Sequence, residues 1–205
     1  MAAYRTIASP ATAEIVEKKS RFIGQIAPAQ AEEEALAFLE AVRAEHRMAR
    51  HNVYAYVLRS GRVRYSDDGE PGGTAGMPTL EAVQHADLVD VAVVVTRYFG
   101  GILLGTGGLV RAYTDATKAA IDAARIVVVS RCVDIMMEVP YNLYEPACRL
   151  AEDAGARVHD TDFAENVLIT FRMLDGTQSP FLEKLTELTR GQSEIIVTDP
   201  FDAAF

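Results

Sequence analysis

The fold of the first half of this chain is decided by one stretch, VAVVVTRYFGGILLGTGG, residues 91–108. Its first part, Val91 to Val95, is apolar without alternation, which predicts a central strand covered on both faces. A helical pattern from Leu109 to Ala124 follows the glycines. A strand, a glycine loop and a helix in this order form an anion-binding arrangement, because backbone N–H groups point outward at the helix start.

A second glycine-rich stretch, SDDGEPGGTAG at residues 66–76, lies earlier in the chain. We call the two segments loop 66–76 and loop 96–108; together they hold nine of the fourteen glycines. Glycine in such numbers indicates backbone that bends sharply or approaches another group closely. The residues that we expect to define the two loops are Ser66, Asp67, Asp68, Gly69, Glu70, Gly76, Gly100 and Gly101.

Composition indicates a globular protein, since 205 residues with 49% apolar content can bury one ample core or two small ones. No apolar run approaches the roughly 18 residues of a membrane span, so we expect a cytoplasmic location and no membrane partner. Cys132 and Cys148 form no CxxC or CxxH pattern, and we therefore predict neither a disulfide scaffold nor a zinc site.

The net charge of −9 is unevenly distributed. Residues 1–131 contain 15 Lys and Arg against 15 Asp and Glu, whereas residues 132–205 contain 5 against 14. This asymmetry predicts two domains with different partners, 1–131 and 132–205. A polyanion should prefer the first domain, because the second would repel it.

Hydrophobic periodicity and turn residues divide the first domain into short elements. Besides those in the opening stretch, we expect strands at 4–9, 14–16, 21–27, 52–58, 62–65 and 126–129, and helices at 30–49 and 78–84.

The second domain has the order β-α-β-β-α-β, which is the ferredoxin-like unit. Its strands are predicted at 133–139, 157–163, 167–173 and 194–198. Asn142 should cap the first helix, with Glu145 in the capping-box position and Gly155 at the end. The second helix should begin at Ser179-Pro180 and end at Gly191.

Loop 96–108 matches neither of two well-defined nucleotide motifs. A Walker A loop requires a lysine where Thr106 stands, and the dinucleotide fingerprint requires a third glycine where Val110 stands. What remains is a helix start with outward N–H groups. It either binds an anion or forms a purely structural turn. The residues concerned are Gly105, Thr106, Gly107 and Gly108.

Arg97 is the charged companion of this loop. At the end of the buried strand it should lie at the carboxyl edge of the sheet, where open α/β sheets bind ligands. It could instead pair with Asp67, Asp68 or Glu70, and an arginine can hold a loop and also contact a phosphate. Arg111 is better explained by ion pairs on a solvated helix face.

A basic stretch runs from Arg43 to Arg64 and contains six arginines, two histidines and a single acid. Arg43, Arg47 and Arg50 share one helix face, and three tyrosines at 54, 56 and 65 are interleaved nearby. Nucleic-acid surfaces combine these ingredients. The alternative is that the arginines lie over the edge of the core while the tyrosines pack beneath them.

The acids of loop 66–76 raise a competing hypothesis, a metal-dependent enzyme acting on a nucleotide or a phosphorylated small molecule. Asp67, Asp68 and Glu70 could hold Mg²⁺, which binds through carboxylates and phosphate oxygens. However, neither loop contains a lysine or histidine, and Asp and Gly are ordinary turn formers. We therefore predict no metal, no cofactor and no catalytic residue.

Several of these segments resemble the signature of the IMPACT/YigZ family. The resemblance covers nearly the whole chain. It implies an α+β fold, in which a ribosomal-protein-S5-domain-2-like N-terminal domain is followed by a ferredoxin-like domain similar to one in the translocase EF-G. The segments that carry it are Ser20-Arg21-Phe22, His51-Asn52 with Ala55-Tyr56, Ser66 to Gly76, Thr96 to Gly101 and Leu104 to Tyr113.

The resemblance also bears on function. Eukaryotic members regulate translation by competing for the activator of a starvation-responsive initiation-factor kinase, and nucleic-acid binding is proposed for bacterial members. This chain has the bacterial two-domain form, so we do not expect the eukaryotic partner. Leu103 stands where the family pattern has a lysine, which removes one charge from the phosphate hypothesis.

We therefore expect a non-enzymatic protein that binds RNA or a ribosome-associated surface through its first domain. Backbone phosphate should contact Arg97 and the helix start at Gly105 to Gly108, with Arg43, Arg47 and Arg50 extending the surface. The acidic second domain should contact a protein partner or limit nonspecific binding. A protein-interaction module without nucleic acid is the remaining alternative.

Overall fold

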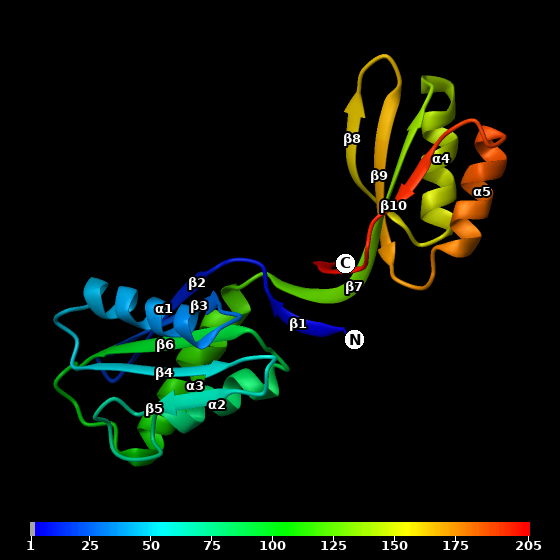
Figure 1. The fold of residues 1–205 in the computed structure, drawn as a ribbon. Coiled ribbons are helices and arrows are strands. Elements are labelled where there is room, and N and C mark those ends of the chain that lie inside the picture. The colour runs from blue at the N-terminus through cyan, green and yellow to red at the C-terminus, as the bar shows by residue number, and fades with distance from the viewer. Residues whose placement is uncertain (1–2) are drawn as a thin grey trace. The chain divides into compact units, whose positions relative to one another are not determined.

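The computed structural model describes residues 3–205, which form two compact α+β units (Figure 1). The N-terminal unit comprises Tyr4–Val127, and the C-terminal unit contains Val128–Phe205. The mixed α+β class expected from the sequence is confirmed. No helix among the described residues is both long enough and apolar enough to cross a membrane.

The N-terminal unit is built on a five-stranded antiparallel sheet with the strand order β2-β3-β6-β4-β5. Another strand, β1, pairs with β7 (Ile126–Val139). The elements of the unit are β1 (Tyr4–Ile7), β2 (Ala11–Glu17), β3 (Ser20–Pro28), α1 (Glu32–Glu45), β4 (His51–Val57), β5 (Val63–Ser66), α2 (Gly76–His85), β6 (Val91–Tyr98) and α3 (Thr106–Ala123).

The central strand β6 is covered on both faces, as its uninterrupted apolar run predicts. Val91, Val93 and Val95 belong to the core formed with α2 and α3, whereas Ala92 and Val94 pack in clusters that contain residues of α1. Helix α1 therefore lies on one face of the sheet, and α2 and α3 lie on the other (Figure 1). Successive strand residues point to opposite faces, so a run that is apolar throughout can bury both sides.

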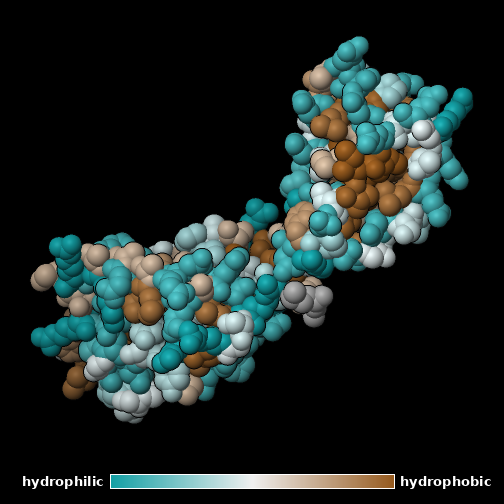
Figure 2. Space-filling view, in the orientation of Figure 1, coloured by the Kyte–Doolittle hydropathy of each residue, from teal (hydrophilic) through white to brown (hydrophobic). Residues whose placement is uncertain are grey.

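The C-terminal unit has the ferredoxin-like element order and the sheet order β10-β7-β9-β8, with every pair antiparallel. The apolar residues of β7 and β9 pack against α4 and α5. Figure 2 shows an apolar area on the surface of this unit, whose strands expose Leu168 and Ile196. The elements are β7 (Ile126–Val139), α4 (Tyr141–Asp153), β8 (Arg157–Phe163), β9 (Val167–Leu174), α5 (Ser179–Thr189), β10 (Ile195–Val197) and β11 (Phe201–Ala204).

Three details of the C-terminal unit differ from the prediction. The strands expected at 126–129 and 133–139 form one continuous strand, β7, so the two units divide within a strand. Asn142 does not cap α4, because the helix begins at Tyr141 and its N-cap is Pro140, two residues before the predicted cap. Strand β11 was not predicted; it pairs with residues Val129 to Cys132 of β7.

Gly24 in β3 allows α3 to lie directly on the sheet. A Cβ atom at this position would be 2.4 Å from the carbonyl oxygen of Ala116, a backbone atom in the middle of the helix. We expect Gly24→Ala to lower the free energy of unfolding by about 1–3 kcal/mol, because the helix must shift to admit the methyl group. Urea denaturation measures this change.

Gly72→Ala is the matched control, since nothing lies within 4 Å of a Cβ atom there and its φ is not positive. Equal stability of the two variants would contradict the close approach of α3 and β3.

Candidate functional site

One end of the N-terminal sheet gathers the two glycine loops. Strand β6 ends where β3 and β4 begin, and the register pairs Tyr98 with Arg21 and Arg97 with His51. The turn between β2 and β3 and the segment that follows α1 therefore lie at this end too. The ligand-binding rule invoked for Arg97 applies to parallel sheets and does not hold here, because every pair of strands in this sheet is antiparallel.

Glu70 joins the two loops through a buried ionic contact. Its Oε1 accepts hydrogen bonds from Arg97 Nη1 at 2.7 Å and from the Tyr113 hydroxyl at 2.8 Å. The exposed fractions of the Arg97 and Glu70 side chains are 8% and 4%. Of the pairings that the sequence left open for Arg97, the structure shows the one with Glu70. Burial and the neighbouring Glu70 carboxylate raise the pKa of Tyr113, so its hydroxyl remains a donor.

Asp67 caps helix α2. Its carboxylate accepts backbone N–H groups from Gly73 at 2.9 Å, Ala75 at 3.0 Å and Gly76 at 2.8 Å. Burial by itself raises the pKa of Asp67, but these three N–H groups outweigh it, and the net pKa is lower than usual. No Cβ atom would fit at Gly76, since it would lie 2.7 Å from the carbonyl carbon of Ser66.

Asp68 holds loop 66–76 against the start of β4. Its Oδ2 accepts the backbone N–H of Asn52 at 2.6 Å, and its Oδ1 lies 3.3 Å from Arg43 Nη2. His51 Nδ1 is 2.8 Å from the carbonyl oxygen of Asp68. Asp68 itself has φ of 43° and is followed by Gly69 with φ of 84°, which turns the chain sharply.

The acids proposed as Mg²⁺ ligands in the enzyme hypothesis thus have separate structural partners. Asp67 binds backbone N–H groups, Asp68 binds β4 and Arg43, and Glu70 binds Arg97 and Tyr113. Within residues 3–205, no group of three or more His, Cys, Asp or Glu side chains is placed to hold a metal ion.

Loop 96–108 packs closely on the β2–β3 turn before it starts α3. The backbone N–H of Gly100 donates to Ser20 Oγ at 3.1 Å, and a Cβ atom on Gly100 would lie 2.0 Å from the carbonyl carbon of Lys19. Gly101 follows with φ of 86°. Gly105 is the N-cap of α3, with φ of 73° and no side-chain cap. Thr106 and Gly107 are exposed, and Gly108 is half-buried.

The three arginines predicted on one helix face do not share one, because α1 ends at Glu45 and only Arg43 lies on it. Arg43 pairs with Glu40 at 2.8 Å and with Asp68. Arg47 is exposed and donates to the carbonyl oxygen of Ala44. Arg50 is exposed and makes no hydrogen bond or ion pair with any residue that the structure describes.

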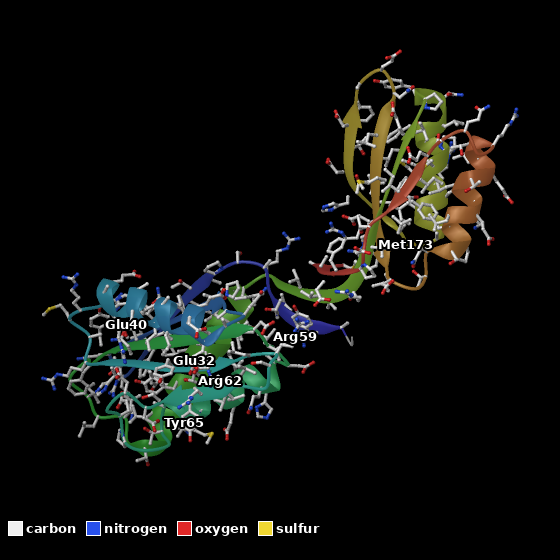
Figure 3. All side chains as sticks on the ribbon, viewed as in Figure 1. Glu32, Glu40, Arg59, Arg62, Tyr65 and Met173 are labelled. Carbon is white, nitrogen blue, oxygen red and sulfur yellow. The ribbon has the colours of Figure 1, made fainter. Side chains whose placement is uncertain are left out.

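The other arginines of the basic stretch contact acids. Arg62 and Arg64 lie beside Glu32; Glu32 and Arg62 are labelled in Figure 3. Tyr56 is buried and donates to the same carboxylate. Arg111 is exposed on α3.

A pocket of about 650 Å³, which the sequence did not predict, lies at the same end of the sheet. Met48, Arg50 and His51 line it from the segment after α1. Arg97, Tyr98, Phe99 and Leu103 line it from β6 and loop 96–108. The lining contains two arginines and no acid. Its only sequence signal is the placement of two aromatic residues between Arg97 and the first glycine pair.

Comparison with known proteins assigns the chain to a family. The Impact N-terminal domain matches residues 18–121, and a domain of unknown function, DUF1949, matches residues 137–192. The chain belongs to the IMPACT family. The resemblance noted in the sequence is therefore confirmed, and both glycine loops lie inside the Impact N-terminal domain.

Bacterial IMPACT family members are similar over nearly their whole length. The chain is 34% identical over 196 residues to YigZ of Escherichia coli, covering 94% of this chain and 96% of that protein. It is 36% identical to YvyE of Bacillus subtilis, covering 94% and 89%. A crystal structure of a hypothetical protein matches with a TM-score of 0.63 at 32% identity, covering 97% of this chain and 98% of the other.

Eukaryotic IMPACT proteins match over a shorter region. A Dictyostelium discoideum IMPACT homologue is 37% identical over 97 residues, which is 44% of this chain and 28% of that protein.

The buried pair of Arg97 and Glu70 should dominate the stability of the loop end. We expect Arg97→Ala to lower the free energy of unfolding by about 3–5 kcal/mol, because it leaves a buried carboxylate without its cation. Arg43→Ala should cost about 1 kcal/mol or less, since both partners of that pair are partly exposed. Chemical denaturation of Arg97→Ala, of Arg43→Ala and of the double variant Arg97→Ala/Glu70→Gln measures these free energies of unfolding. Equal losses for Arg97→Ala and Arg43→Ala would contradict the expectation.

The cap at Asp67 should make folding sensitive to acid. A carboxylate whose folded pKa is depressed contributes stability above its unfolded pKa, about 3.9, and loses it as pH falls through the lower folded pKa. Asp67→Asn should therefore be less stable than the natural protein at pH 7, with the difference shrinking below about pH 4. Thermal melting from pH 7 to pH 3 measures this difference; a constant difference would refute the role of the charged form.

Proposed function

We propose that this IMPACT family member binds RNA, or an RNA-bearing surface of the ribosome, at the loop end of its N-terminal unit, and that it acts in the regulation of translation. The observation that carries the proposal is the balance of charges at this end. The acids of loop 66–76 are hydrogen-bonded within the protein, whereas Arg47 and Arg50 are exposed without an acidic partner. Phosphate recognition needs cations of this kind.

The start of α3 adds backbone donors to these cations. Gly105 provides no side-chain cap, and the first intrahelical acceptor, its carbonyl oxygen, serves Leu109. The N–H groups of Thr106, Gly107 and Gly108 therefore have no acceptor within the helix, as in helix termini that bind phosphate. Lys18 and Arg111 line a pocket with Gly108, although Glu17 and Asp115 line it too.

The proposal assigns different roles to the predicted residues. Arg47, Arg50 and the α3 start contact phosphate. Arg43 positions loop 66–76 through Asp68, and Arg97 positions it through Glu70. The C-terminal unit, with its excess of acids, contacts a protein partner or limits nonspecific binding to nucleic acid.

RNA binding should depend on salt and on the unpaired arginines. In fluorescence anisotropy with a labelled RNA of mixed sequence, we expect the logarithm of the affinity to fall linearly with the logarithm of the salt concentration. Arg50→Ala should weaken binding and reduce the magnitude of the slope by about one.

Arg62→Ala is the matched control, because Arg62 already pairs with Glu32 and should contribute little. If no RNA binds at low salt, or if the Arg62 and Arg50 variants lose affinity equally, the proposed surface is wrong. Crosslinking in cell lysate then identifies whether a protein is recovered instead of RNA.

A further inference from the structure

The pocket lined by Arg50, Arg97 and Phe99 has a composition that phosphate binding does not explain. Besides the two arginines and a histidine, it is lined by large side chains that a soluble protein seldom leaves in water. Met48 is 87% exposed, Leu103 is 82% exposed and Phe99 is 57% exposed. Exposed apolar groups gathered around one cavity indicate a ligand with an apolar face.

Arg97, which lines the same pocket, has an unsatisfied donor. Nη1 is bonded to Glu70, but Nε is buried and has no acceptor among the described residues. Buried donors without a partner are costly and uncommon in folded proteins. An acceptor on a ligand in the pocket, reached directly or through one bridging water, would satisfy this N–H group.

His51 adds an acceptor beside these donors. Its Nδ1 lies 2.8 Å from the carbonyl oxygen of Asp68, which cannot donate, so Nδ1 carries the proton in the neutral ring. Nε2 is then the acceptor of a residue that lines the pocket. The site therefore offers donors, an acceptor and an aromatic ring together.

We infer that this pocket takes an unstacked nucleobase of single-stranded RNA; the inference rests on the function proposed above. The base stacks on Phe99 between the apolar side chains of Met48 and Leu103. Its edge presents acceptors and donors to Arg97 and His51. The adjoining backbone phosphates reach the cations and helix start described above.

A nucleobase fits the pocket better than two other ligands. A free phosphate would leave the two apolar side chains without a partner, and the ring of Phe99 with only the Arg97 guanidinium, whose Cζ lies 5.7 Å from the ring centroid. An apolar peptide with a free carboxylate would satisfy the arginines, but it leaves the outward N–H groups at the start of α3 unused. Single-stranded RNA would use both the apolar lining and the N–H groups of α3, because aromatic stacking and backbone charge act together in its recognition.

The experiment compares three fluorescein-labelled RNAs in anisotropy titrations at one salt concentration. They are a single strand of mixed sequence, the same strand with its central bases replaced by abasic sites, and its duplex. We expect the single strand to bind at least tenfold more tightly than the other two. Phe99→Ala should lose about tenfold in affinity for the single strand only, as stacking on an aromatic side chain requires.

Ile102→Ala is the matched control, because Ile102 is 42% exposed in the same loop but does not line the pocket. Its affinity should stay within twofold of the natural protein. Competition adds a second readout: nucleoside 5′-monophosphates should displace the single strand at concentrations where ribose 5-phosphate does not. Melting temperatures of both variants verify that they fold.

The outcomes separate the inference from the proposed function. Salt-dependent binding that is equal for single strand and duplex, and unchanged by Phe99→Ala, overturns the base pocket and leaves RNA binding standing. Absence of RNA binding overturns both. Phe99-dependent binding of an apolar peptide with a free carboxylate, with no preference for single-stranded RNA, also overturns the base pocket.

Discussion

The buried contact of Glu70 with Arg97 and Tyr113 is the constraint on which the rest of the N-terminal unit depends. It joins loop 66–76, the end of β6 and helix α3, which are far apart in the chain. Removing either charged partner would leave the other buried without a counter-charge, because both side chains are almost fully buried. The conformation of each loop therefore depends on the other loop. With loop 66–76 fixed in this way, Asp67 and Asp68 are placed to bind the backbone of α2 and β4.

This internal use of carboxylates decides what the loop end presents to a ligand. An exposed cluster of three acids would repel phosphate, but here Glu70 is buried, the partly buried Asp67 and Asp68 accept hydrogen bonds from the protein, and two arginines are exposed. Glycine at positions 100 and 105 brings the backbone close to the β2–β3 turn and then opens the start of α3. The same loop exposes Phe99 and Leu103, so charge, backbone donors and apolar surface occur at one edge of the sheet.

Much of this fold could be predicted from the sequence, because local patterns fix local structure. The uninterrupted apolar run of β6 and the element order of the C-terminal unit are examples. Features that depend on distant partners could not be predicted. Nothing local distinguishes Glu70 from Asp67 and Asp68 as the partner of Arg97, and the continuity of β7 depends on pairing with β9, β10 and β11. The pocket escaped prediction for the same reason, since its residues come from two segments about fifty positions apart in the chain.

Binding at the loop end of the N-terminal unit can be mapped residue by residue. Backbone amide chemical shifts would be recorded by NMR while single-stranded RNA is added to the uniformly ¹⁵N-labelled full chain. We predict that the largest shift changes fall on His51, Phe99 and the start of α3 at Thr106 to Gly108. Changes confined to the C-terminal unit, or no changes at saturating RNA, would contradict binding at the loop end.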